Sequence, residues 1–318
     1  MGPLVLAENQ DCIIERREVS NPHLLSLLKD IYVERGTKED WEALKELHYK
    51  AENLGIAPRV YRCVLENKVI GVGVITVPKM LLGGRNELFD KWLRPNVGGL
   101  DTRIINVHRA KWMNKHIGVN SRLVLDTTYR GAGVAYRMQN IMMRMSGKRF
   151  IEFQSSMSKF NPFAVKAGMR FTRPRRSANY DKGLVFFRRW FESIPTDFIG
   201  VMHEINAMPE KVREKCVAEM RHFYYSSSSM EKSGDNRMNG TRRVDALTVG
   251  KLLKNLQQLV FASPLYGVYE NPDYDIAADS SRALPARIPV LAFDNQAVDA
   301  PLDLSFITEH HALDAKAN

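Results

Sequence analysis

The stretch LVLDTTYRGAGVA, residues 123–135, decides the fold that the sequence predicts. Its apolar start, residues 123–125, has the pattern of a buried strand. Glycines at 131 and 133 then indicate a turn, and from 131 to 146 apolar side chains recur at helical spacing along one face. The stretch therefore predicts a strand, a glycine-containing turn and an amphipathic helix in direct succession.

A turn of this kind is suited to a pyrophosphate group. The amides of the first turn of a helix have no partner inside the helix, and the helix dipole favours negative charge there. Gly131 and Gly133 lack the Cβ atoms that would hold phosphate oxygens away from those amides, and Arg130 can add a charge-assisted contact. The sequence contains no GxxxxGK followed by Ser or Thr, which excludes a P-loop, and GxGxxG is also absent.

The stretch resembles motif A of the GNAT superfamily of N-acetyltransferases, Arg/Gln-x-x-Gly-x-Gly/Ala after a strand, and Arg130, Gly133 and Ala135 match it in register. Residues 150–171, FIEFQSSMSKFNPFAVKAGMRF, resemble motif B of the same superfamily, and the resemblance covers residues 10–190. It implies that the loop binds the pyrophosphate of acetyl-CoA or another acyl-CoA, while the preceding strand binds the pantetheine arm through its backbone. The cofactor-binding residues that it implies are Leu123, Val124, Leu125, Arg130, Gly131, Ala132, Gly133, Val134, Ala135 and Asn161.

Transfer of an acyl group to an amine needs a base for the amine proton, and four side chains are candidates for catalysis. Glu152 lies on the strand expected after the helix, where the geometry of the superfamily places the acceptor amine between two splayed strands. His108 lies on a strand expected over residues 103–111, and His48 and Tyr49 lie on an early helix. Each has a structural alternative. Glu152 is then a surface carboxylate and His108 a satisfied interior or surface histidine, while His48 packs and Tyr49 caps the core.

One residue of the superfamily pattern is missing. The tyrosine that returns a proton to the departing thiol aligns with Ala164, which has no proton to donate. Tyr49 or Tyr129 can take this role, or water can, or the enzyme is altered or inactive, and the sequence leaves these alternatives open. No motif of cysteine or histidine residues predicts a metal site.

The chain is basic, with 46 Lys and Arg against 36 Asp and Glu and a net charge of +10. Cations bind phosphate groups and aromatic rings stack on bases, so a run that combines both predicts a nucleic-acid partner. Such a run follows motif B: its first cations are Arg170, Arg173, Arg175 and Arg176, and its aromatic residues are Tyr180, Phe186, Phe187 and Trp190. The alternative is an edge strand over residues 183–191 whose aromatic side chains face inward.

Composition limits the class of protein. Hydrophobic residues make up 44% of the 318 residues, which indicates a globular chain. Three widely separated cysteines, and no apolar run of bilayer length, favour a soluble, cytoplasmic protein with no membrane partner.

We expect an α/β fold with a GNAT-like mixed, mainly antiparallel sheet flanked by helices and a helical C-terminal extension. The expected divisions are a GNAT-like acyltransferase domain at 1–192, a mostly helical extension at 193–269 with a flexible linker at 226–241, and an acidic, Pro- and Ala-rich tail at 270–318.

The function that these observations favour is acyl-CoA-dependent N-acyl transfer, with acetyl-CoA as the default donor. The expected acceptor is an amine, of a nucleic-acid base or of a nucleic-acid-associated substrate. Residues 48–49, 85–86 and 159–163 resemble a divergent GNAT branch that includes phage Mom-like DNA-modification proteins, so base modification on the same fold is a second interpretation. A third is a non-catalytic nucleic-acid-binding module.

Overall fold

The chain divides into two compact units in the computed structural model. The sheet unit comprises residues 1–172 and 265–318, and the helical unit comprises residues 173–264. The described residues are 25–48, 54–80, 82–89, 93–94, 102–159, 161–173, 176–232, 236, 238–262, 264–274 and 283–308. This division differs from the one expected at residues 192 and 269, because the chain leaves the sheet earlier and later returns to it.

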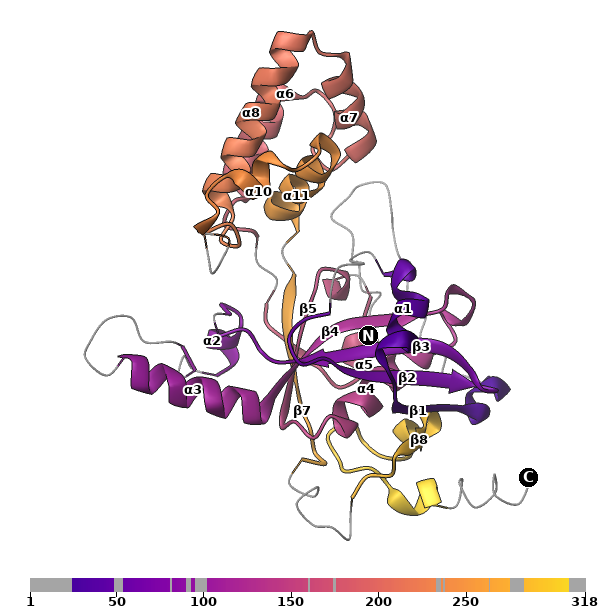
Figure 1. The fold of residues 1–318 in the computed structure, drawn as a ribbon. Helices are drawn as coiled ribbons and strands as arrows, with labels where there is room; N and C mark the ends of the chain where they lie inside the picture. The colour runs from indigo at the N-terminus through magenta and orange to yellow at the C-terminus, as the bar shows by residue number, and fades with distance from the viewer. Residues whose placement is uncertain are drawn as a thin grey trace. The chain divides into compact units, whose positions relative to one another are not determined.

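The sheet unit is built on one eight-stranded sheet in the order β6-β7-β5-β4-β3-β2-β1-β8. Its strands are β1 (Ile31–Arg35), β2 (Arg59–Leu65), β3 (Lys68–Thr76), β4 (Ile117–Leu125), β5 (Phe150–Ser155), β6 (Arg170–Phe171), β7 (Leu265–Glu270) and β8 (Arg287–Pro289). Figure 1 labels these strands apart from β6. Among the described strands, β4 and β5 form the one parallel pair, and all other neighbours are antiparallel. The expected mixed, mainly antiparallel sheet is confirmed.

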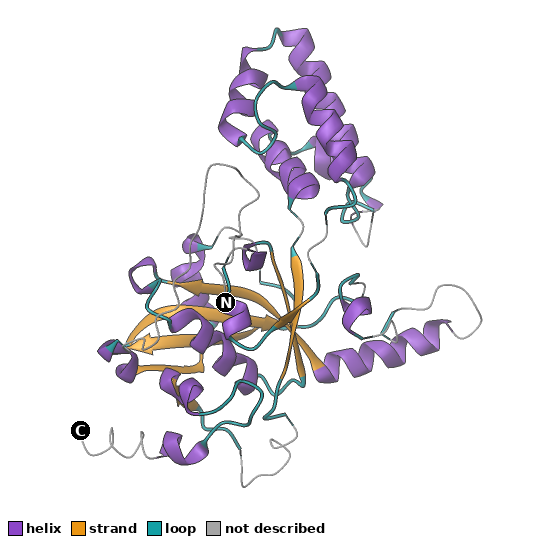
Figure 2. Cartoon of the chain, turned by 180° about the vertical axis from the view of Figure 1, so that it is seen from behind, coloured by secondary structure: helices purple, strands orange, loops and turns teal. Residues whose placement is uncertain are grey.

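Helices flank this sheet on both faces (Figure 2). They are α1 (Lys38–Leu44), α2 (Arg85–Leu88), α3 (Thr102–His116), α4 (Val134–Met145) and α5 (Phe163–Lys166), with short 3-10 turns η1 (Ser26–Asp30), η2 (Lys45–Leu47), η3 (Thr127–Tyr129), η4 (Met157–Lys159) and η7 (Val290–Asn295). Met138 of α4 and Leu125 share one buried cluster, whereas Trp41 of α1 shares another with Val124. Because successive strand residues point to opposite faces, α4 and α1 lie on opposite sides of the sheet.

The helical unit interrupts the sheet between β6 and β7. Its described helices are α6 (Tyr180–Trp190), α7 (Phe198–Ala207), α8 (Glu210–Ser227), α10 (Arg242–Asp245) and α11 (Val249–Phe261). They enclose a core of their own in which Phe187 and Leu253 are fully buried. After α11 the chain re-enters the sheet as β7, which pairs with both β5 and β6. The expected helical C-terminal extension is therefore wrong, because these helices are an insertion between two paired strands.

The segment expected to be an acidic tail packs onto the sheet unit wherever the structure describes it. Ile288 and Leu302 are buried in the main core, and β8 adds a strand beside β1. The carboxylate of Asp273 accepts a hydrogen bond from Nη1 of Arg144 in α4 at 2.6 Å, and both side chains are buried. The prediction of a tail is wrong, because acidic side chains of this segment pair with arginines of α4 and are not all solvated.

The linker expected at 226–241 is also packed in part. α8 continues to Ser227, and the fully buried Glu231 accepts a hydrogen bond from Nε of Arg243 at 3.1 Å. A buried carboxylate is stable only with such a partner. Glu231 is therefore packed and paired, so the prediction of a flexible linker is wrong at this position.

Two segments expected to be strands are helices. Residues 103–111 lie in α3, and residues 183–190 lie in α6. Ile104 and Val107 are β-branched, which favours a strand by propensity, but on α3 they are 60% and 45% exposed. Met113 of α3 is buried in a cluster with Ile117 of β4. Within the described part of the chain, no helix combines the length and apolar character needed to cross a bilayer.

Candidate functional site

The turn between β4 and α4 has the strand, glycine and helix order that the sequence predicts. After β4, the side chain of Asp126 accepts a hydrogen bond from the backbone N–H of Thr128 at 3.0 Å and closes the short turn η3. Gly131 and Gly133 then have left-handed φ angles of 87° and 81°, which only glycine adopts readily. α4 begins at Val134 with no side-chain cap, so the amides of its first turn are left for another partner.

The two glycines of this loop have different surroundings. A Cβ built on Gly131 meets no atom within 4 Å, so the space in front of this residue is open. A Cβ on Gly133 would lie 2.5 Å from Nη1 of Arg137, whose guanidinium donates to the carbonyl of Gly133 at 3.0 Å. Arg137 is buried and is held by two hydrogen bonds to Asp294, at 2.7 and 2.9 Å. The open part of the loop is therefore the part around Gly131.

The other predicted cofactor residues lie along this turn. Arg130 is exposed. Its Nε donates to the carbonyl of Leu125 at 3.2 Å, which holds the guanidinium beside the end of β4. Val134 is fully buried, while Ala132 and Ala135 are half-buried against the same core. The side chains at these three positions are apolar, so a hydrogen bond to a ligand there comes from the backbone.

β4 and β5 separate in the middle of β4. Their parallel pairing runs from Ile117 opposite Phe150 to Asn120 opposite Phe153 and ends there. A β-bulge at Ser121 follows, since Val74 and Ile75 of β3 face Arg122 and Asn120. Leu123, Val124 and Leu125 keep their pairing with β3 but do not pair with β5. We call this point the fork; beyond it, one edge of β4 carries backbone groups that no described strand pairs.

Glu152, the candidate base, is fully buried in a network of charged and polar side chains. Its carboxylate accepts hydrogen bonds from Nε and Nη2 of Arg85 at 2.5 and 2.8 Å. The hydroxyl of Tyr266 donates to the same carboxylate at 2.7 Å. Burial, and then the negative charge of Glu152, raise the pKa of Tyr266 well above its usual value. The three side chains tie α2, β5 and β7 together, and Glu152 has no exposed surface from which to meet an amine.

The other candidates for catalysis do not gather at the fork. His108 is exposed on α3 and not on a strand, so its expected place before Leu123 is wrong. His48 follows η2 and is half-buried, with its ring centroid 5.9 Å from that of Trp41 in an edge-to-face contact. Tyr49 lies outside the described residues.

Two residues of motif B have structural roles in α5. The side chain of Asn161 accepts a hydrogen bond from the backbone N–H of Phe163 at 3.1 Å, which satisfies an amide at the start of this short helix. Ala164 is fully buried in the main core of the sheet unit. The position at which the resemblance expects a tyrosine is therefore occupied by a side chain of the hydrophobic core.

The predicted nucleic-acid residues are distributed over both units. Arg170 is exposed on β6 of the sheet unit, 3.8 Å from Glu270. Arg173 and Arg176 are exposed in the helical unit, and Arg175 lies outside the described residues. The aromatic part of the prediction is wrong for the two phenylalanines: Phe186 and Phe187 are buried in the core of the helical unit, because α6 turns one face inward.

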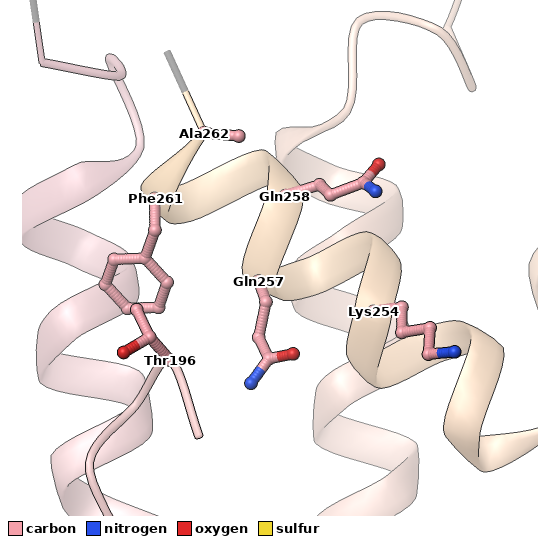
Figure 3. A pocket seen from close by; sticks show the side chains of 6 residues that line it. All are labelled: Thr196, Lys254, Gln257, Gln258, Phe261 and Ala262. Atoms are coloured by element: carbon pink, nitrogen blue, oxygen red, sulfur yellow. The ribbon is translucent and has the colours of Figure 1, made fainter. Parts of the chain in front are cut away.

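The helical unit has a shallow pocket of its own (Figure 3). Its lining residues are Thr196, Lys254, Gln257, Gln258, Phe261 and Ala262. None of the residues singled out from the sequence lines it. Among the described residues, no group of three His, Cys, Asp or Glu side chains is arranged to hold a metal ion.

Two buried polar residues at or near the fork, Tyr266 and Asn120, were not predicted from the sequence, and Arg85, noted only for a family resemblance, was not predicted to pair with Glu152. Arg85 and Tyr266 are far from Glu152 in the chain, by 67 and 114 residues. Asn120 precedes the LVL strand that drew attention, but its polar side chain in an apolar run was a signal that could have been read.

Comparison with known proteins assigns no family to this geometry. No protein-family model matches the chain, no curated protein matches it, and no solved structure matches it.

Proposed function

We propose that the chain is an acyl-CoA-dependent N-acyltransferase that uses acetyl-CoA as its default donor. The observation that carries this proposal is the turn at 130–134, where two left-handed glycines lead into an uncapped helix directly beyond the fork of β4 and β5. Unpaired amides and a positive helix end suit a diphosphate, and the unpaired edge of β4 suits an extended arm that carries amide groups.

The residues present fit such a ligand. The open space at Gly131 leaves room for phosphate oxygens, and the exposed Arg130 supplies a cation beside them. The backbone of residues 122–125 offers donors and acceptors along the unpaired edge of β4. Bound acetyl-CoA would supply an activated acyl group: its carbonyl carbon would bond to the amine nitrogen and its bond to sulfur would break, while water takes the amine proton and returns one to the thiolate.

The buried side chains nearby hold this arrangement in place. Glu152 and Arg85 fix α2 against β5, and the paired carboxylate leaves no lone pair directed at solvent. We therefore assign Glu152 to positioning and not to removal of the amine proton. We propose an amine as acceptor, on a nucleic-acid base or on a nucleic-acid-associated substrate. Arg170 of the sheet unit is exposed and, taken by itself, offers a cation to a phosphate group.

One observation favours a second candidate, a non-catalytic module that keeps the ligand-binding fold. The superfamily position of the proton-donating tyrosine holds the fully buried Ala164, and no side chain from this position can reach a ligand. Such a module would bind acyl-CoA or nucleic acid without turnover.

Thermal unfolding of the full chain with and without acetyl-CoA tests the proposal, because a ligand that binds only the folded state raises the melting temperature. We expect a concentration-dependent rise with acetyl-CoA. Incubation with amine-containing oligonucleotides or peptides, followed by intact-mass measurement, then distinguishes turnover from binding alone. The absence of any shift at millimolar acetyl-CoA would rule out both the transferase and a CoA-binding module.

A further inference from the structure

A buried side-chain amide at the fork of β4 and β5 has no partner. Asn120 is 2% exposed, and among the described residues neither its Nδ2 nor its Oδ1 makes a hydrogen bond. An unpaired buried amide destabilises the folded protein, and nearly all such groups in proteins are satisfied. Asn120 therefore has both a donor group, Nδ2, and an acceptor atom, Oδ1, available to a molecule that enters the fork.

The position of Asn120 places this amide next to the open edge of β4. Its register partners are Ile75 on β3 and Phe153 on β5, and it is the last residue of β4 that pairs with β5. The bulge at Ser121 follows at once. Side chains of register partners share a face of the sheet, and Ile75 and Phe153 both belong to the cluster that contains α4.

We propose that Asn120 binds an amide group of the pantetheine arm of acyl-CoA, with Nδ2 donating to its carbonyl and Oδ1 accepting from its N–H. This inference rests on the proposed function. The chemistry selects an amide, because one planar group then satisfies both atoms of Asn120. An ionised phosphate has only acceptors, so it would leave Oδ1 of Asn120 unpaired. An ammonium group has only donors, so it would leave Nδ2 unpaired.

A second buried asparagine shows what a purely structural role looks like in this fold. Asn140 of α4 is 0% exposed, and its Nδ2 donates to the carbonyl of Ala167 at 3.0 Å. Its Oδ1 accepts from Nε of Arg144 at 2.6 Å. The same substitution at the two asparagines thus compares an unpaired amide with a fully paired one.

The test uses the full chain as wild type, Asn120→Leu and Asn140→Leu. Removal of an unpaired amide stabilises the ligand-free protein, so Asn120→Leu raises Tm by a few degrees, whereas Asn140→Leu lowers it. Calorimetric titration with CoA should show binding weakened at least about tenfold in Asn120→Leu. Adenosine 3′,5′-bisphosphate, which carries the nucleotide of CoA but no amide arm, should bind the wild type and Asn120→Leu within about twofold.

Each other outcome overturns a specific statement. A fall in Tm for Asn120→Leu like that of Asn140→Leu shows that Asn120 is paired in the ligand-free protein, and unchanged CoA affinity shows that it does not contact the arm. Equal loss of both ligands assigns Asn120 to the nucleotide and not to an amide. A wild type that binds neither ligand overturns the proposed function itself.

Discussion

Removal of the carboxylate of Glu152 should destabilise the sheet unit strongly. Glu152→Leu leaves the guanidinium of Arg85, which is 1% exposed, without its counter-charge, and it leaves the hydroxyl of Tyr266 without an acceptor. Breaking a buried ion pair on one side costs about 3–5 kcal/mol. Because the penalty comes mainly from the stranded charge, the double variant Arg85→Met, Glu152→Leu should recover most of it.

Urea unfolding followed by tryptophan fluorescence measures this difference. Three of the four tryptophans belong to the sheet unit, so a Trp190→Phe background makes the signal report on that unit alone. The conservative Glu152→Gln variant keeps the shape and loses the charge, and should lie between wild type and Glu152→Leu. If Glu152→Leu stays within about 1 kcal/mol of the background, or if the double variant is as unstable as the single one, the buried pair is not what holds α2 to β5.

Further predictions concern the loop, the motif B helix and the thiols. Gly131→Glu should abolish CoA binding in a titration at a stability cost of about 1–2 kcal/mol, while Gly147→Glu, at another open left-handed glycine, should show the same cost and normal binding. Ala164→Tyr should overpack the core, lower stability by about 1–3 kcal/mol in denaturant unfolding and give no more activity than the wild type; a stable variant with faster turnover would contradict this. Burial raises the pKa of the Cys63 thiol, and burial followed by the charge of a nearby carboxylate raises that of Cys216 to about 11. Native protein should therefore show at most one reactive thiol to a disulfide reagent at pH 8, against three after unfolding, and stability should fall as pH rises above about 8.5, where only the unfolded thiols lose protons.

Local sequence signals predicted the turn that positions the candidate site. An apolar strand, two glycines and a helical repeat follow one another within a few residues, and each obeys a rule that depends on near neighbours. The strand predictions at 103–111 and 183–191 were wrong, because contacts with distant parts of the chain decide the structure there. Gly183 of α6, for example, lies against Val260 of α11, where a Cβ would overlap the valine side chain, and its neighbours pack as a helix against α11.

Pairings across long stretches of chain were beyond prediction from one sequence. The sequence predicts Glu152 as a base or as a surface carboxylate, but it is fully buried, and its partners come from α2 and β7. The acidic C-terminal segment had the composition of a tail because nothing local shows that Asp273 and Asp294 meet Arg144 and Arg137. In both cases burial of charge is explained only by the tertiary fold.

The interrupted β6–β7 hairpin has a consequence for biosynthesis. Tyr266 follows Glu152 by 114 residues, so a ribosome needs about 6–23 s to supply the strand that lies beside β5. During that interval β5 has one unpaired edge, and the inserted helices, whose buried cluster contains only their own residues, are being synthesised. Translation therefore finishes the insertion before the sheet can close, and a nascent chain halted within residues 173–264 would leave the β5 edge open to pairing with other strands.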